Sequence, residues 1–313
     1  MKHDAPTGDL SIWNVGVLAV GLYEDEWAND PTFESLDGAL DGKLRPVLSG
    51  EEFKAKAGAS KMSHTLQAAG PQRLFFFGLG KRSDLQLSGV RDFVHAAMGA
   101  AGDSKCGNLG VALPGGMDFP GGLLESQMVM AAELGRYNFG KYQEEAKPST
   151  VQEVSWRGLG DGSMDGTTNA KALAAGVART RDLVNEPPGV CTPGFLLANA
   201  KEIASRYGLK IEVYNRAELN ERGFGCLVGV SLGSDEEAYL IELTYTPANE
   251  ARSSVALIGK GITFDSGGYD LKPAAYMLDM KTDMAGAATV LGVIQDHQDE
   301  GARGQREVHL HAL

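Results

Sequence analysis

The sequence is poor in cysteine. Its 313 residues include three, at Cys106, Cys191 and Cys226. An odd number of widely spaced cysteines argues against a disulfide framework and favours a reducing compartment. Each of the three is expected to be a small buried residue.

Long apolar runs are missing as well. No stretch of about 18 apolar residues occurs, so a membrane-spanning helix is not expected. The first nine residues, Met1 to Asp9, contain no hydrophobic segment of the kind that a signal peptide carries. We therefore expect a cytoplasmic protein, with an organellar form that has lost its transit peptide as the alternative.

Concentrated positive charge is also lacking. The formal net charge is -12, and the acidic residues are spread along the chain. Proteins that bind nucleic acids usually carry clustered Lys and Arg. Neither a nucleic-acid partner nor a membrane partner is therefore indicated.

What remains is an ordinary globular composition, with 43% hydrophobic and 22% charged residues. The length suits one large or two ordinary domains. In the first half, segments typical of strands alternate with segments typical of helices, which predicts an α/β unit whose mostly parallel sheet is covered on both faces. The expected strands are 15–22, 73–77 and 109–113, and the expected helices are 90–100 and 123–137.

Glycine and charge become frequent between positions 147 and 166, which indicates a domain boundary. We expect an N-terminal α/β domain over 1–160, a linker with a helix over 161–188, and a second domain over 189–313. The linker helix, predicted for 168–183, should end before Asn185-Glu186-Pro187-Pro188, because a proline disfavours the helical conformation of the residue before it.

Four ionisable side chains lie close together in the second domain: Lys260, Asp265, Lys272 and Asp283. The apolar run 254–258 before them predicts a short buried strand, and open α/β sheets bind ligands where such strands end. From position 284 onward, apolar residues at 284, 287, 288, 291 and 294 predict an amphipathic helix with Asp283 as its N-cap.

Two carboxylates beside a lysine suit a divalent cation, because a nearby dication favours the neutral, ligating form of the amine. Each residue also has a simpler interpretation: Asp283 as a helix cap, Asp265 as a turn residue, and Lys260 or Lys272 as a surface charge. The glycines on both sides of Lys260 favour the joint interpretation, since they permit close backbone approach.

Two glycine-lysine pairs raise the question of phosphate binding. A Walker loop ending at Lys260 would need glycine at position 254 and Ser or Thr at 261, where this chain has Ser254 and Gly261. The segment Gly78-Leu79-Gly80 lacks the third glycine of a dinucleotide fingerprint and is interpreted as a turn that ends a strand. A nucleotide-binding function is therefore not supported.

The segments Gly259 to Gly268, Leu271 to Pro273 and Met280 to Gly292 resemble the leucine aminopeptidase family, the two-metal cytosol aminopeptidases. The segment from Gly223 to Ser234 resembles that family's next loop and strand. The resemblance implies an N-terminal α/β domain followed by a C-terminal α/β catalytic domain with a mixed sheet, the latter incomplete here.

The same resemblance implies roles for five residues. Lys260, Asp265 and Asp283 would be metal ligands. Lys272 would be catalytic and hold the scissile carbonyl oxygen, and Met280 would line the apolar pocket for the first side chain of the substrate. Two divalent metal ions (Zn, Mn or Mg), a peptide with a free N-terminus and a homo-oligomer, a hexamer, are implied as cofactors and partners.

The chain departs from the family pattern after the helix that follows Asp283. A further stretch of the form Asp-x-Glu-x-Arg, which the family uses for metal binding and catalysis, is not reached before Leu313. We therefore expect either a fragment of an active aminopeptidase or a non-catalytic homologue that acts as a binding or assembly subunit. His309 and His311 would share one face of a final strand; this pair is left unassigned.

Overall fold

The computed structural model describes residues 1–313 except 67, 121, 160–166, 248–252, 300–305 and 313. Of residues 297–299 and 306–312 it describes the backbone alone. The chain divides into two compact units, Met1–Lys171 and Ala172–Leu313. Each unit is described by itself below.

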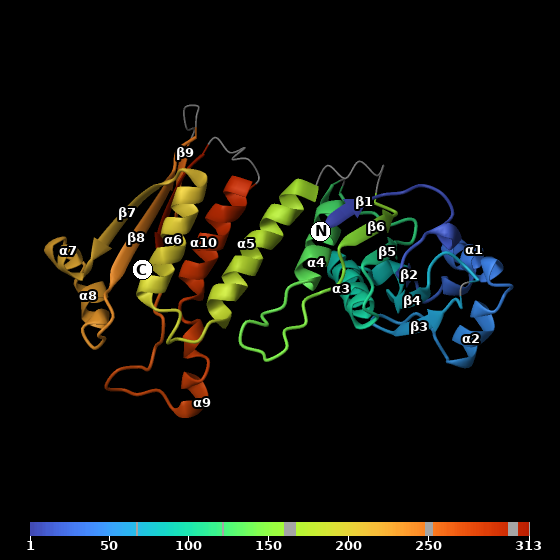
Figure 1. The fold of residues 1–313 in the computed structure, drawn as a ribbon, viewed down its shortest axis with the longest axis horizontal. Helices are drawn as coiled ribbons and strands as arrows, with labels where there is room; N and C mark the ends of the chain where they lie inside the picture. The colour runs from blue at the N-terminus through green and yellow to red at the C-terminus, as the bar shows by residue number, and fades with distance from the viewer. Residues whose placement is uncertain (67, 121, 160–166, 248–252, 300–305, 313) are drawn as a thin grey trace. The chain divides into compact units, whose positions relative to one another are not determined.

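Unit 1 is built on a six-stranded sheet with the order β1-β6-β5-β2-β4-β3 (Figure 1). All neighbours pair in parallel except β3, which runs antiparallel to β4 at one edge. The predicted, mostly parallel sheet is confirmed. The strands are β1 (Lys2–Asp4), β2 (Val17–Leu22), β3 (Ser60–His64), β4 (Arg73–Gly78), β5 (Asn108–Ala112) and β6 (Glu153–Arg157).

Helices cover both faces of this sheet. Successive residues of a strand point to opposite faces: Val17 joins a core with Phe93, and Leu18 joins a second core with Phe33. All six residues of β2 are consequently buried. The helices are α1 (Pro31–Ala39), α2 (Leu44–Gly50), α3 (Leu87–Asp103) and α4 (Leu123–Gly135), with 3-10 turns η1 (Leu10–Ile12), η2 (Trp27–Asn29) and η3 (Arg82–Asp84).

Unit 2 contains a mixed four-stranded sheet with the order β7-β8-β10-β9. Strand β8 runs antiparallel to both of its neighbours, whereas β10 and β9 are parallel. The mixed sheet expected for the second domain is therefore found. Its strands are β7 (Lys210–Asn215), β8 (Tyr239–Tyr245), β9 (Ser253–Gly259) and β10 (Arg306–Ala312).

Helices α6 and α10 pack against this sheet and form the core of the unit with it. Ile241 and Leu243 of β8 meet Met284, Ala287 and Leu291 in that core, so the apolar stripe read from position 284 does face inward. The helices are α5 (Thr167–Asn185), α6 (Pro193–Tyr207), α7 (Arg216–Glu221), α8 (Gly225–Ser231), α9 (Ala274–Met277) and α10 (Ala285–Asp299), with the 3-10 turn η4 (Met280–Thr282).

Helices α5 and α10 approach each other closely through glycine. A Cβ atom on Gly176 would lie 2.5 Å from the carbonyl oxygen of Gly292, so neither position has room for a side chain. Thr180 Oγ1 donates to the carbonyl of Ala288 at 3.2 Å, and Arg179 donates to Gln295 of α10 and to Asn199 of α6. The three helices thus form one bonded layer.

Three expectations for unit 2 are wrong. Strand β9 is not buried: it lies at the sheet edge, and Ile258 is 67% exposed because α6 and α10 cover the opposite face. The segment after Gly223 forms helix α8 rather than a loop and a strand. Cys226 on that helix is exposed, whereas Cys106 and Cys191 are buried as expected.

No helix within the described residues is long and apolar enough to cross a membrane.

Candidate functional site

The site begins where the end of β9 touches the start of α10. A Cβ atom on Gly259 would lie 2.4 Å from the carbonyl oxygen of Gly286, so this approach requires glycine. The backbone N–H of Ala287 donates to the carbonyl of Lys260 at 2.8 Å. Residues that are far apart in sequence are thereby placed side by side.

The first ion pair joins Lys260, which follows β9, to Asp283, which follows η4. The lysine side chain is 55% exposed and the carboxylate 19% exposed. Helix α10 begins at Ala285, and the N–H of Ala288 bonds to the carbonyl of Met284. The expectation that Asp283 is the N-cap of this helix is therefore wrong, and its carboxylate is directed to Lys260 instead.

The second ion pair joins Lys272 to Asp265. Lys272 Nζ lies 2.6 Å from Asp265 Oδ2 and 3.2 Å from the carbonyl oxygen of Asp265. Asp265 Oδ1 also accepts the N–H of Gly267 at 2.9 Å, so the residue serves its local turn as well. Gly267 has φ +97°, which explains the glycine, because side-chain-bearing residues rarely adopt that conformation.

The two pairs are electrostatically linked. The hydrogen bond from Lys272 lowers the pKa of Asp265 most, the hydrogen bond from the Gly267 N–H lowers it further, and the positive charge of Lys260 adds to both. Lys260 thus acts on the carboxylates of both pairs. Two carboxylates and two ammonium groups therefore share one charged cluster.

Met280 joins this cluster from η4. Its sulfur lies 3.2 Å from Lys272 Nζ, and the residue is half-buried. The five residues selected from the sequence as candidates thus form two contacting groups, Lys260–Asp283 and Asp265–Lys272–Met280, which the charge of Lys260 links.

Sequence reasoning missed one residue of this region, Lys281. Its Nζ donates to the backbone carbonyl of Asn185 at 3.0 Å, where α5 ends. The sequence gives no direct signal for this bond, because the partner is a main-chain oxygen 96 positions away. The one indirect signal is that Lys281 lies between two candidate site residues, Met280 and Asp283.

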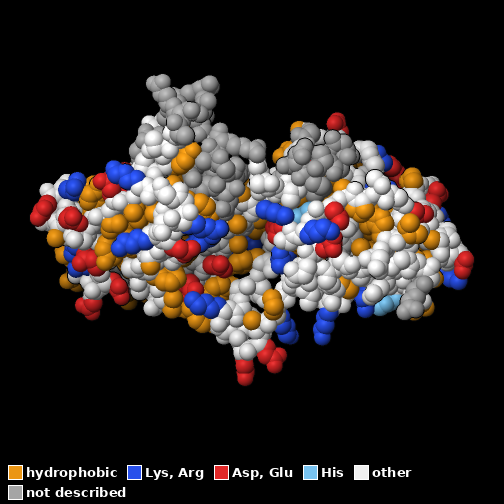
Figure 2. All heavy atoms as spheres, turned by 45° about the horizontal axis from the view of Figure 1, so that its top comes forward, with side chains coloured by type: hydrophobic (Ala, Val, Ile, Leu, Met, Phe, Trp, Pro, Cys, Tyr) orange, Lys and Arg blue, Asp and Glu red, His pale blue; other side chains and the backbone are white. Residues whose placement is uncertain are grey.

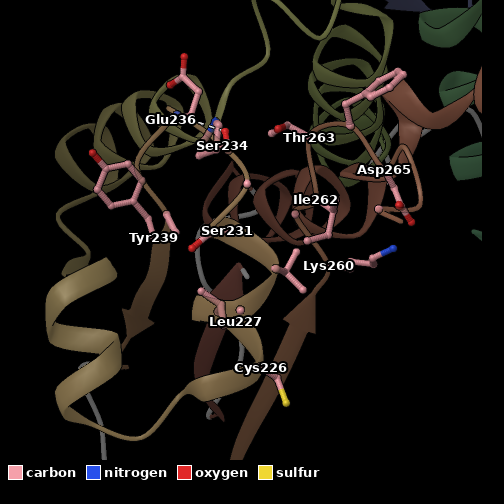
Figure 3. Close-up of a pocket in the computed structure, with 18 of the residues that line it drawn as sticks. Cys226, Leu227, Ser231, Ser234, Glu236, Tyr239, Lys260, Ile262, Thr263 and Asp265 are labelled. Carbon is pink, nitrogen blue, oxygen red and sulfur yellow. Dashed lines mark hydrogen bonds between the residues drawn. The ribbon is translucent and has the colours of Figure 1, made fainter. Parts of the chain in front are cut away.

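A groove of about 1610 Å³ runs beside the cluster. One wall is α8 with the residues that flank it (223–234), and the other is the loop after β9 (260–269). Figure 3 shows Lys260 and Asp265 together on the side of the loop, with Ser231, Ser234 and Tyr239 across from them. Glu236 lies on the same side as Ser234 and Tyr239, so charged groups line both sides of the groove.

The donors suit a hard or borderline cation in type. Carboxylate oxygens of Asp265 and Asp283 and the amine of Lys260 are chemically competent ligands, and a lysine ammonium now neutralises each carboxylate. In the part of the chain that the structure describes, no three His, Cys, Asp or Glu side chains form a cluster that could hold a metal. The described chain therefore offers a partial set, since structural zinc takes four ligands and calcium six to eight.

The surface charges agree with the lack of a basic stretch in the sequence. Among the side chains coloured in Figure 2, Lys and Arg lie interspersed with Asp and Glu on the face drawn. For His309 and His311 the structure describes the backbone alone, which forms the expected strand, β10.

Two solved structures resemble this chain over most of its length. A tomato leucine aminopeptidase carrying a lysine-to-glutamate substitution matches with a TM-score of 0.86 and 29% identity, covering 100% of this chain and 62% of the other. The bottromycin maturation enzyme BotP, in complex with Mn, matches with a TM-score of 0.77 and 27% identity, covering 95% and 58%.

Sequence relatives give the same result. A probable cytosol aminopeptidase of Parasynechococcus marenigrum is 37% identical over 312 residues, covering 99% of this chain and 62% of the relative. One of Geobacter sp. (strain M21) is 36% identical over 291 residues, covering 89% and 57%. The chain thus spans about 60% of the length of these relatives.

Two family models match consecutive parts of the chain. The N-terminal domain of the cytosol aminopeptidase family matches residues 19–146, and the catalytic domain of the same family matches residues 178–310. The two matches fall in units 1 and 2 respectively. With the shared fold and the relatives above, they establish that this chain belongs to the cytosol aminopeptidase family.

Proposed function

We propose that the chain belongs to a metal-dependent aminopeptidase that releases apolar N-terminal residues from peptides. One observation carries the proposal: two aspartates and two lysines from separate segments meet where β9, η4 and α10 converge. Family membership supports the same reaction class.

Asp265, Asp283 and Lys260 would hold the metal. Each carboxylate is now neutralised by the ammonium group of a lysine. A bound dication would take over this role. When bound, two such cations would supply an activated water and polarise the scissile carbonyl. Asp265 is suited to ligation because its carboxylate is ionised at neutral pH, and the hydrogen bond from Lys272 lowers its pKa further.

Lys272 would act as the electrostatic group. Its ammonium is a compact positive charge held beside Asp265 and Met280, and it is 28% exposed. A charge fixed in this way stabilises the oxyanion that develops on a carbonyl oxygen. Metal binding should depend on it far less than turnover does.

Met280 would contact the first side chain of the substrate. A half-buried thioether is apolar and adapts its shape, which suits a range of aliphatic side chains. Glu236 in the wall of the groove would attract the positively charged amino terminus of a peptide. The proposed substrate is therefore a peptide with a free N-terminus and an apolar first residue.

Metal binding tests the ligands directly. Titration calorimetry with Mn²⁺ should show binding to the unmodified chain, and Asp265→Asn or Asp283→Asn should weaken it at least about tenfold. Asp279→Asn is the matched control, since Asp279 is exposed at the start of η4 and caps no backbone N–H there. An equal loss of Mn²⁺ affinity in all three variants would contradict the assignment of Asp265 and Asp283 as metal ligands.

Lys272→Ala tests the electrostatic role. We expect it to lower the rate of leucyl-anilide hydrolysis by about 10²-fold or more while Mn²⁺ affinity changes little. Lys210→Ala, which removes an exposed lysine of the same unit, should alter neither. Parallel loss of turnover and metal binding would contradict the assigned role.

Further proposals come from the sequence and from the family. From the sequence we propose the domain limits 1–160, 161–188 and 189–313 and a cytoplasmic location. From the family we propose a hexameric assembly and Zn, Mn or Mg as the metal. Light scattering measures the assembly, and metal analysis after purification under anaerobic and metal-limited conditions identifies the ion.

A second candidate is a non-catalytic assembly subunit. The partial donor set of the described residues favours it, because two carboxylates and one amine leave a cation short of ligands. Mixing the chain with a full-length relative and measuring particle size separates the two ideas. Co-assembly without Mn²⁺ binding by the chain supports the subunit, and a chain that ignores the relative contradicts it.

A further inference from the structure

We infer that Lys281 is a positioning residue: by binding the last carbonyl of α5, its ammonium holds η4 so that Asp283 and Met280 face Lys260 and Lys272. The inference extends the proposed function, on which its metal-binding consequence rests. The structural part concerns the placement of one turn and stands independently.

The bond has the geometry of a charge-assisted contact. Lys281 Nζ lies 3.0 Å from the carbonyl oxygen of Asn185, in a partly buried position. Asn185 ends the 19-residue helix α5, where the last carbonyls carry the negative end of the helix dipole. A lysine is therefore doubly favoured at this point, by the hydrogen bond and by the dipole.

The turn that Lys281 holds has little support of its own. It is a single 3-10 turn in which the N–H and Oγ1 of Thr282 donate to the carbonyl of Asp279, and the N–H of Asp283 donates to the carbonyl of Met280. Just before it, Tyr276 is 73% and Leu278 is 79% exposed. Directly after the turn, Met284 is fully buried, so the turn is anchored at one end and loosely packed at the other, where a bond from another segment can hold it.

The partner of Lys281, in contrast, is well fixed. Leu183 near the end of α5 is 3% exposed, and Arg179 and Thr180 bond this helix to α6 and α10. Beyond Asn185, the carbonyl of Pro187 accepts the N–H groups of both Val190 and Cys191. The end of α5 is therefore a rigid point to which a weak turn can be tied.

Because Lys281 lies between two site residues in the sequence, its bond to α5 also affects the position of those residues. Lys281 lies between Met280, which contacts Lys272, and Thr282, which precedes Asp283. Met280 and Asp283 are three residues apart and so share one face of a 3-10 turn, which is directed to the charged cluster, while Lys281 is directed to α5. Release of the ammonium would let both site residues move together.

The simpler role for Lys281 is that of a cap that stabilises α5 alone. The two roles differ in where the protein loosens. Loss of a cap frays the last turn of α5, whereas loss of a positioning residue frees the amides of η4 and weakens ligands that Lys281 does not touch.

The experiment compares Lys281→Met, Lys281→Arg and the control Lys210→Met by amide hydrogen exchange and Mn²⁺ calorimetry. We expect Lys281→Met to speed exchange at Thr282 and Asp283 by about tenfold or more and to weaken Mn²⁺ binding by about tenfold, as loss of an outer support of metal ligands does. Lys281→Arg should restore most of both, since arginine also donates to a carbonyl, and the control should change neither.

The outcomes separate the two proposals. Faster exchange confined to the end of α5, or unchanged exchange throughout, would overturn the positioning role. If the unmodified chain binds no Mn²⁺, the proposed function fails, and the exchange rates still decide the role of Lys281. If exchange also rises in β8, Lys281→Met has unfolded the unit, and the role is then decided by Lys281→Gln, whose amide can still donate to the Asn185 carbonyl and should protect η4.

Discussion

Strands β2 and β9 have similar sequences and opposite surroundings. Both are runs of apolar and small residues, Val17–Leu22 and Ser253–Gly259, that end at a loop. All six residues of β2 are buried, whereas exposed and partly buried residues alternate along β9. Apolar composition therefore predicted a buried strand in both cases, and the burial is found only in β2.

The difference lies in what packs against each strand. Strand β2 is central in its sheet and has a hydrophobic core on each face. Strand β9 is at an edge, and among the described residues α6 and α10 cover the face that carries Leu257 while Ile258 points the other way. The comparison teaches that the position of a strand in its sheet, and not its apolar composition alone, decides whether the strand is buried.

The two units can be followed separately in solution. All three tryptophans, Trp13, Trp27 and Trp156, lie in unit 1. Tryptophan fluorescence therefore reports the unfolding of unit 1, and far-UV circular dichroism reports both units. The predictions below use this separation.

The largest effect is expected from truncating the central strand. Leu18→Ala should lower the free energy of unfolding of unit 1 by roughly 2–5 kcal/mol, because it opens a cavity in a core where Leu18 is fully buried. Ile258→Ala, a truncation of similar size on β9, should cost less than about 1 kcal/mol. Denaturant titrations measure both values, and equal costs would show that β9 is covered in solution.

The next largest effect concerns the contact between β9 and α10. Gly259→Ala should destabilise unit 2 by about 3 kcal/mol and weaken Mn²⁺ binding, because the new Cβ would meet backbone atoms of Gly286. Gly229→Ala is the control: this glycine is within α8 with nothing near its Cβ, so the change should be neutral or stabilise slightly. Unaltered Mn²⁺ affinity in Gly259→Ala would show that metal binding does not depend on the contact between β9 and α10.

The smallest effect is a pH dependence in unit 2. Burial, helped by the negative charge of Glu186, raises the pKa of the Cys191 thiol to about 11. The folded state then keeps a proton that the unfolded state loses near pH 9, so stability is complete below pH 9 and falls as the pH rises toward 11, by on the order of 2 kcal/mol.

Cys191→Ala should remove that slope between pH 9 and 11, while Cys226→Ala should retain it because Cys226 is exposed. Thiol labelling at pH 8 should accordingly modify Cys226 first in the folded protein. Rapid labelling of Cys191 under the same conditions would contradict its burial.

Much of the fold was accessible from the sequence because local patterns are strong. Helices expected at 90–100, 123–137 and 168–183 are found as α3, α4 and α5 with slightly different ends. The sequence predicted that the four ionisable residues lie near one another, but it did not predict which lysine pairs with which aspartate. The capping role of Asp283, the burial of Cys226 and the strand after Gly223 were wrong, since each depended on contacts that local sequence does not contain.

The sequence by itself determined the alternation of strands and helices, the glycines at close approaches, and the motif that places this chain in its family. These follow from backbone geometry and side-chain periodicity, which act over a few residues. Only the tertiary structure decided that Asp283 faces Lys260 rather than its own helix, that β9 lies at an edge, and that Lys281 reaches the end of α5. Those outcomes depend on which segments meet in space, and the free energy of such meetings comes from packing and charge pairing between residues that are far apart along the chain.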